Sequence, residues 1–110
     1  MAIPAVVLIS GTGSNLADLL SRLDDSPHPP VEVLAVGADV DAPGLDHATK
    51  RAIPTFVHPL AAGESREEWG RGLAERIAEF NPELIILSGF MKLLPPGFVD
   101  RFSPRIINTH

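Results

Sequence analysis

The sequence predicts an α/β protein built on a doubly wound parallel sheet. Short apolar runs rich in β-branched residues, typical of strands buried on both faces, alternate along the chain with segments of helical periodicity. A glycine-rich turn follows the first apolar run directly. In such a fold the crossovers are right-handed, and ligands bind at the carboxyl ends of the strands.

The first strand is expected where Ala5-Val6-Val7-Leu8-Ile9 forms an unbroken apolar run that is cut by Ser10-Gly11-Thr12-Gly13. Leu84-Ile85-Ile86-Leu87 is a second run of the same kind. Branched apolar residues also dominate the remaining segments. The expected strands cover residues 5–9, 31–36, 55–57, 84–87 and 105–108.

Helices are expected between these strands. Leucines recur at spacings of three and four from Ser14 to Leu23, so one helix begins straight after the glycine turn. Two shorter helices are expected over residues 45–51 and 95–102.

The clearest helical pattern begins at a capping box, formed by Ser65 and Glu68, and carries an apolar stripe headed by Trp69. Gly70 and Gly72 lie inside this helix. Each glycine costs about 1 kcal/mol relative to alanine, so packing of the apolar stripe must hold the helix in place.

The composition of the chain excludes several classes of function. The 110 residues carry a formal net charge of −5, and no stretch concentrates Lys or Arg, so nucleic acid and anionic membranes are not expected partners. The chain has no Cys, which excludes thiolate chemistry and agrees with a reducing compartment. The first apolar run is too short for a signal peptide or a membrane span. We therefore expect a soluble cytoplasmic protein.

The turn Ser10-Gly11-Thr12-Gly13-Ser14-Asn15 lies between a strand and a helix, where free N–H groups and the helix dipole favour an anion such as phosphate. Leu16 replaces the third glycine of a dinucleotide fingerprint, and no Lys follows as in a Walker loop. The alternative interpretation is a tight turn in which Ser14 or Asn15 merely caps the helix.

Two further segments lie at carboxyl ends of expected strands. Residues 88–94 carry aromatic, thioether and aliphatic side chains that could line a pocket for a flat heterocycle or simply cover the core. Asn108 and His110 project from one face of a strand end. The amide can donate to an oxyanion and the imidazole can pass a proton, which suits acyl transfer. The same pair is also compatible with simple hydrogen bonding.

No covalent acyl-enzyme is expected, because the chain has no Cys and no Ser in an elbow motif. His28, His47 and His58 are interpreted as surface residues without metal-ligand spacing. Asp39 lies where the ribose-binding acid of an NAD site would be expected, but the missing third glycine disfavours that interpretation. With Asp41, Asp46 and His47, it is expected to form a solvated acidic loop rather than a metal site.

Several motifs together carry a family resemblance: Ser10-Gly11-Thr12-Gly13-Ser14-Asn15, Ser65-Arg66-Glu67, Gly89-Phe90-Met91-Lys92-Leu93-Leu94 and Asn108-Thr109-His110. In order and spacing they resemble the folate-dependent phosphoribosylglycinamide formyltransferase family. The resemblance implies a Rossmann-like formyltransferase fold, of which residues 1–110 would be the N-terminal part of a single domain. It implies transfer of a formyl group from 10-formyltetrahydrofolate to phosphoribosylglycinamide in purine synthesis, without a metal.

The resemblance also implies roles for single residues. Gly13, Ser14 and Asn15 would hold the phosphate of phosphoribosylglycinamide. Asn108 would polarise the formyl oxygen and contact folate, and His110 would be the general acid or proton shuttle. The other expected folate contacts are Arg66, Met91, Lys92, Leu93 and Leu94. Lys92 stands where the family often has Arg, and Ala38-Asp39 stands where the second strand often ends in Ser-Asn.

Other functions are also compatible with these residues. A hydrolase of formyltetrahydrofolate or a transferase that formylates initiator tRNA would share Asn108 and His110 but lack the phosphate turn. A non-catalytic phosphosugar-binding module would need only that turn. The resemblance is compatible with a homodimer. Members of the family continue beyond the position of His110 with an Asp that tunes the histidine, so we expect residues 1–110 alone to be inactive.

Overall fold

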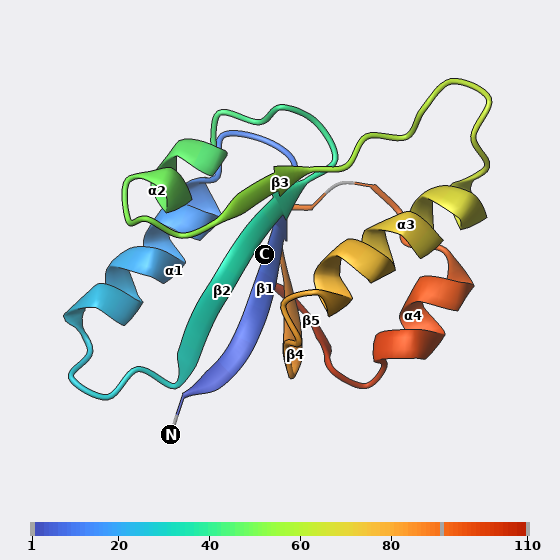
Figure 1. Cartoon of the computed structure of the whole chain (residues 1–110). Helices are drawn as coiled ribbons and strands as arrows, with labels where there is room; N and C mark the ends of the chain where they lie inside the picture. The colour runs from blue at the N-terminus through green and yellow to red at the C-terminus, as the bar shows by residue number, and fades with distance from the viewer. Residues whose placement is uncertain (1, 91, 110) are drawn as a thin grey trace.

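The computed structural model describes residues 2–90 and 92–109. Strands and helices alternate along this part of the chain (Figure 1). In order they are β1 (Ile3–Ile9), α1 (Ser14–Asp25), β2 (Val31–Ala38), α2 (Leu45–Thr49), β3 (Thr55–Val57), α3 (Arg66–Ala78), β4 (Leu84–Ser88), α4 (Pro96–Phe102) and β5 (Ile106–Thr109).

The strands form one five-stranded sheet in the order β3-β2-β1-β4-β5, and every pair is parallel. The predicted α/β fold with a parallel sheet is therefore confirmed. From β1 the chain moves outward to β2 and β3 and then returns to place β4 on the other side of β1. The reversal creates a switch point between the carboxyl ends of β1 and β4, where ligands bind in open α/β sheets.

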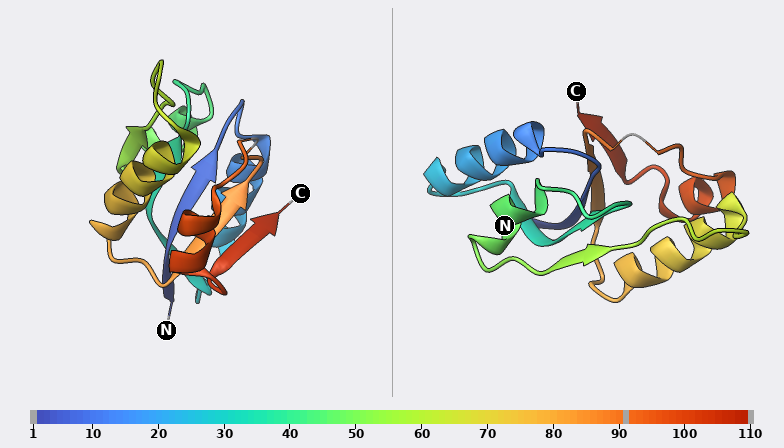
Figure 2. Two further views of the ribbon diagram at one scale, coloured as in Figure 1. Left: turned by 90° about the vertical axis from the view of Figure 1, so that its right-hand side faces the viewer. Right: turned by 90° about the horizontal axis from the view of Figure 1, so that it is seen from above.

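Two helical layers cover the sheet. Helices α1 and α2 lie on one face, and α3 and α4 lie on the other (Figure 1, Figure 2). Alternate side chains of β1 therefore enter different cores: Val7 and Ile9 join α1 and α2, whereas Val6 and Leu8 join α3 and α4. This double burial explains the unbroken apolar run of the first strand.

The two glycines of helix α3 lie where neighbouring segments leave no room for a side chain. A Cβ atom on Gly70 would overlap Pro95 Cγ, and one on Gly72 would lie 2.9 Å from His58 Cε1. The predicted capping box is confirmed, since Ser65 Oγ accepts from the Glu68 N–H at 3.1 Å. Ser65 Oγ also donates to Glu68 Oε1 at 3.1 Å.

Helix α1 begins differently from the capped turn considered above. Its N-cap is Gly13, at φ 75° and ψ 28°, and no side chain makes a capping hydrogen bond there. The interpretation of Ser14 or Asn15 as the cap is therefore wrong. Among the described residues, no helix is both long and apolar enough to cross a membrane.

Candidate functional site

The glycine turn and the end of β4 enclose a cavity of about 230 Å³ at the switch point. Its lining consists of Ser10, Gly11, Thr12, Gly13, Ser14, Asn15, Ser88 and Gly89. Because Gly13 caps α1 without a side chain, the first N–H groups of the helix lack a side-chain partner from the N-cap. The positive end of the helix dipole lies at the same place, so this cavity suits an anion.

Gly44 supports the glycine turn from the start of α2. A Cβ atom on Gly13 would lie 2.8 Å from Gly44 Cα, and the Gly44 N–H donates to the Gly11 carbonyl at 3.1 Å. Two backbones can approach this closely only where side chains are absent. Sequence reasoning missed Gly44, because its contact with the turn depends on the tertiary fold.

Ser88, the last residue of β4, is a second polar residue that the sequence analysis did not single out. Its side chain is buried at 2% exposure, and its Oγ has no hydrogen-bond partner among the described residues. A buried hydroxyl without a partner is uncommon, because its desolvation is not compensated. Its place in the lining of the glycine-turn cavity adds an unused polar group to that site.

A larger cavity of about 430 Å³ lies on the other side of β4, toward β5 and α4. Its lining consists of Leu87, Phe90, Lys92, Leu93, Leu94, Val99, Ser103, Pro104, Ile106 and Asn108. It therefore unites several residues that the sequence analysis predicted to act together, with Asn108 as an exposed polar group on a mostly apolar wall. Met91 and His110, which were predicted for the same site, lie outside the described residues.

Arg66 is also close to this cavity, although it belongs to α3. Its Nη1 donates to the carbonyl of Leu93 at 3.0 Å, so the side chain reaches the loop that was predicted to act with it. Beneath the loop, the Phe90 and Trp69 rings stack with their centroids 6.4 Å apart. Arg66 of the predicted segment Ser65–Glu67 thus meets Leu93 of the predicted segment 89–94.

Asp39 differs from its expected place in a solvated acidic loop. It is 9% exposed, and its Oδ1 accepts a hydrogen bond from Ser10 Oγ at 2.8 Å. Lys92 Nζ lies 3.7 Å from Asp39 Oδ2. The interpretation as a solvated residue is wrong for Asp39, whereas Asp41 and Asp46 are exposed. No group of three or more metal-ligating side chains gathers in the part of the chain that is described.

His58 is likewise not a simple surface residue. It is half-buried, and its Nε2 lies 3.1 Å from the carbonyl oxygen of Trp69. The Trp69 indole N–H donates to the carbonyl of His58 at 2.8 Å. His47 is also half-buried, near Gly13, whereas His28 is exposed as predicted.

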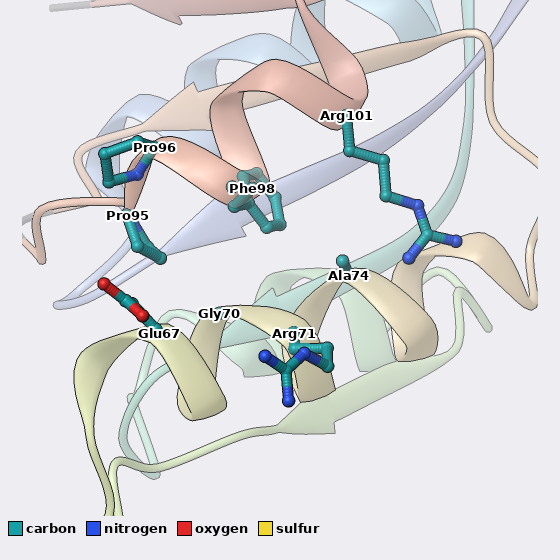
Figure 3. Close-up of a pocket in the computed structure, with 9 residues that line it drawn as sticks. Glu67, Gly70, Arg71, Ala74, Pro95, Pro96, Phe98 and Arg101 are labelled. Atoms are coloured by element: carbon teal, nitrogen blue, oxygen red, sulfur yellow. The ribbon is translucent and has the colours of Figure 1, made fainter.

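A third cavity, of about 280 Å³, lies between α3 and α4 (Figure 3). Gly70 and Ala74 lie along its α3 side, and Arg71 and Arg101 approach it from the two helices. None of the predicted site residues lines it. It arises where the small residues of α3 face the start of α4, and it is separate from the two cavities beside β4.

The chain is similar to known enzymes over nearly its whole length. A family model described as formyl transferase matches residues 4–110. A phosphoribosylglycinamide formyltransferase of Mycobacterium tuberculosis is 39% identical over 96% of this chain and 48% of the relative. That of Escherichia coli is 34% identical over 96% of this chain and 50% of the relative. The chain thus spans about half the length of these curated relatives.

Solved structures have the same fold. A phosphoribosylglycinamide formyltransferase of Coxiella burnetii aligns with a TM-score of 0.90 at 37% identity, covering 98% of this chain and 51% of that one. A formyltetrahydrofolate deformylase of Pseudomonas putida aligns with a TM-score of 0.86 at 27% identity, covering 100% of this chain and 38% of that one. The fold is therefore shared by a transferase and by an enzyme named for removal of the formyl group.

Proposed function

The chain belongs to the formyl transferase family, and on that premise we propose that the full-length protein transfers a formyl group from 10-formyltetrahydrofolate to the amine of phosphoribosylglycinamide. The observation that carries this proposal is the pair of cavities on the two sides of β4. Ser88 and Gly89 line the glycine-turn cavity, and Leu87 and Phe90 line the larger one. Two substrates bound there would meet at the end of a single strand.

The glycine-turn cavity is the proposed site for the phosphate of phosphoribosylglycinamide. Gly13, Ser14 and Asn15 form the start of α1, so their N–H groups and the helix dipole would hold the anion. The left-handed Gly13 and the unpartnered hydroxyl of Ser88 support a site that is completed by a polar ligand.

The larger cavity is the proposed site for the formyl-folate co-substrate. Its lining of aliphatic and aromatic side chains suits a flat heterocycle, and Asn108 supplies a polar group at the wall. We propose that Arg66, the segment 91–94 and Asn108 contact the folate. The hydrogen bond from Arg66 to Leu93 supports a common site for the first two of these.

The proposed reaction needs no covalent enzyme intermediate. The glycinamide nitrogen attacks the formyl carbon, a C–N bond forms, and the carbonyl electron pair moves to oxygen. When this pair returns, the bond between the formyl carbon and N10 of folate breaks. N10 keeps the bonding pair and takes up a proton, while the attacking nitrogen loses one. We propose that Asn108 donates a hydrogen bond to the oxyanion and that His110 carries the proton.

Hydrolysis of formyl-folate is the second candidate, because the chain also aligns well with a deformylase. Water would then replace the amine, and formate would be released. The anion site at the glycine turn favours the transferase, since hydrolysis requires no phosphorylated acceptor. A non-catalytic module that binds phosphosugars would use the turn alone.

The test is an assay of the full-length protein with and without phosphoribosylglycinamide. We expect formyl-folate to be consumed only when the acceptor is present. Equal consumption without the acceptor would establish the hydrolase, and binding of the acceptor without turnover would establish the binding module.

We further propose that residues 1–110 form the N-terminal part of a single formyltransferase domain. The chain spans about half of its curated relatives, and β5 lies at an edge of the sheet with Ile107 exposed at 46%. Strands of a parallel sheet are normally covered on both faces, so this apolar face suits contact with a further part of the domain.

A further inference from the structure

A chain of polar contacts crosses the carboxyl edge of the sheet and joins the two cavities beside β4. Ser10 Oγ donates to Asp39 Oδ1 at 2.8 Å, and Lys92 Nζ lies 3.7 Å from Asp39 Oδ2. Ser10 lines the glycine-turn cavity, and Lys92 lines the larger cavity. Asp39, just past the end of β2, therefore contacts one lining residue of each cavity.

The contact between Asp39 and Lys92 is important because little of either side chain is exposed to solvent. The side chain of Asp39 is 10% exposed and that of Lys92 is 21% exposed. A carboxylate this far from water is costly unless hydrogen bonds and an opposite charge compensate for its desolvation. Removal of one partner would leave the other without its opposite charge, so the two side chains restrict each other's position.

Trp69 holds the same loop from the side of α3. The Lys92 ammonium lies 5.6 Å from the centroid of the Trp69 ring, within cation–π range, and Phe90 stacks on the same indole at an interplanar angle of 6°. Two hydrogen bonds to His58 fix the indole and its backbone in turn. Trp69 is fully buried, so it forms a rigid base beneath the loop.

Arg66 holds the outer side of the loop by its hydrogen bond to the Leu93 carbonyl. The loop after β4 is thus attached at Phe90, Lys92 and Leu93 to side chains that come from α3 and from Asp39 after β2. Among these attachments, the one through Asp39 is the only described charge pair, and it alone extends to the glycine turn.

We propose that Asp39 is a positioning residue for the co-substrate site: its carboxylate holds Lys92, and thereby the loop after β4, in the shape that receives formyl-folate. This inference rests on the proposed function, because it takes the cavity lined by Lys92 as the folate site. In this arrangement the Lys92 ammonium is neutralised within the protein and serves to fix the loop.

The first test is Asp39→Asn in the full-length protein, with Asp41→Asn as the matched control. The amide oxygen of Asn can still accept from Ser10, so the substitution removes mainly the charge that faces Lys92. We expect the KM for formyl-folate to rise roughly five- to tenfold, as for loss of a part-buried charge contact, with kcat and the KM for phosphoribosylglycinamide within about twofold. The exposed Asp41 should tolerate the same change.

A double-mutant cycle with Lys92→Met tests whether Asp39 acts through Lys92. Each single variant leaves one charge without its opposite charge, whereas the double variant removes both charges. We therefore expect Asp39→Asn to have little further effect on the KM for formyl-folate in the Lys92→Met background. Additive effects would overturn the inference.

Direct binding of tetrahydrofolate, measured by calorimetry, separates this inference from the proposed function. An unchanged Kd and KM in Asp39→Asn overturns the positioning role while the wild-type assay still supports formyl transfer. A parallel change in both KM values and in kcat, together with a lower Tm, also overturns it in favour of a structural role. Wild-type protein that binds tetrahydrofolate without transferring formyl refutes the function alone, and absence of binding refutes both.

Discussion

Gly13 is the residue at which the backbone of the proposed phosphate site is most constrained. It has a left-handed φ of 75°, and an added Cβ would come within 2.8 Å of Gly44 Cα. Gly13→Ala is therefore expected to lower the free energy of unfolding by about 1–3 kcal/mol and to weaken binding of the phosphorylated substrate. Urea denaturation and calorimetry of the full-length protein measure the two effects.

Gly11 supplies the matched control for this prediction. An added Cβ at Gly11 meets nothing within 4 Å, so Gly11→Ala should change the free energy of unfolding by less than about 1 kcal/mol. Equal losses in the two variants would show that the backbone approach of Gly13 to Gly44 is unimportant.

Replacement of Ser88 is expected to stabilise the protein, whereas replacement of Gly13 destabilises it. Its buried hydroxyl lacks a partner among the described residues, so Ser88→Ala removes an uncompensated polar group and should raise the free energy of unfolding by about 1 kcal/mol. Ser10→Ala is the contrasting variant, because it deprives Asp39 of a hydrogen bond and should destabilise the protein. Chemical denaturation distinguishes these outcomes, and a loss of stability in Ser88→Ala would contradict the account.

His110 and its proposed role are tested by kinetics. If the imidazole carries the proton, His110→Ala should lower kcat at least about 100-fold, a typical contribution of general acid–base catalysis. The Kd for phosphoribosylglycinamide should change little, because the proposed phosphate site lies at the start of α1. The exposed His28→Ala is the control, and a His110→Ala enzyme that keeps most of its kcat would exclude the proton-transfer role.

At the residue level, the sequence predicted which segments meet but not the contacts that join them. The motif residues Lys92, Leu93, Leu94 and Asn108 do line one cavity. Asp39 looked like part of a polar loop, because no local pattern reveals that Ser10 and Lys92 would surround it. The same limit applies to Gly44, whose role depends on a backbone from another part of the chain.

At the level of elements, α3 shows how tertiary packing overrides local preference. Gly70 lowers the intrinsic stability of the helix, yet the start of α4 occupies the space that a side chain would need. Gly70→Ala should therefore lower Tm despite the gain in helix propensity. In α4, Gly97→Ala meets no atom within 4 Å and should be neutral or stabilising by up to about 1 kcal/mol.

Thermal unfolding of the two alanine variants tests this contrast. A rise in Tm for Gly70→Ala would show that α3 and α4 can separate without cost. The sequence indicated that packing must compensate for the helix glycines, but it could not identify Pro95 as the neighbour. The helix itself was predictable because its capping box and its Trp69 stripe are local signals.

The presence of each strand was similarly predictable from the sequence, but the residues at which the strands end were less so. β2 continues to Ala38, two residues beyond the expected end, because it pairs with β1 on one side and β3 on the other. The polar and glycine residues after Val36 hid this extension. Conversely, α2 ends at Thr49, before the expected boundary at Arg51.

At the level of the whole molecule, the fold brings two unlike cavities to the end of one strand. The glycine-turn cavity is lined by Ser, Thr, Asn and Gly residues at a helix N-terminus, whereas most residues that line the neighbouring cavity are aliphatic or aromatic, with Asn108 among them. The alternation of apolar runs with helical segments predicted the parallel sheet, but only the strand order places β4 between the two cavities. This arrangement is the basis for proposing direct transfer between two bound substrates.

The most direct measurement follows an isotopically labelled formyl group in a reaction of the full-length protein with 10-formyltetrahydrofolate and phosphoribosylglycinamide. We expect the label to move to the glycinamide nitrogen, with one tetrahydrofolate released for each formylated product. Recovery of the label as free formate, at a rate that does not depend on phosphoribosylglycinamide, would contradict it.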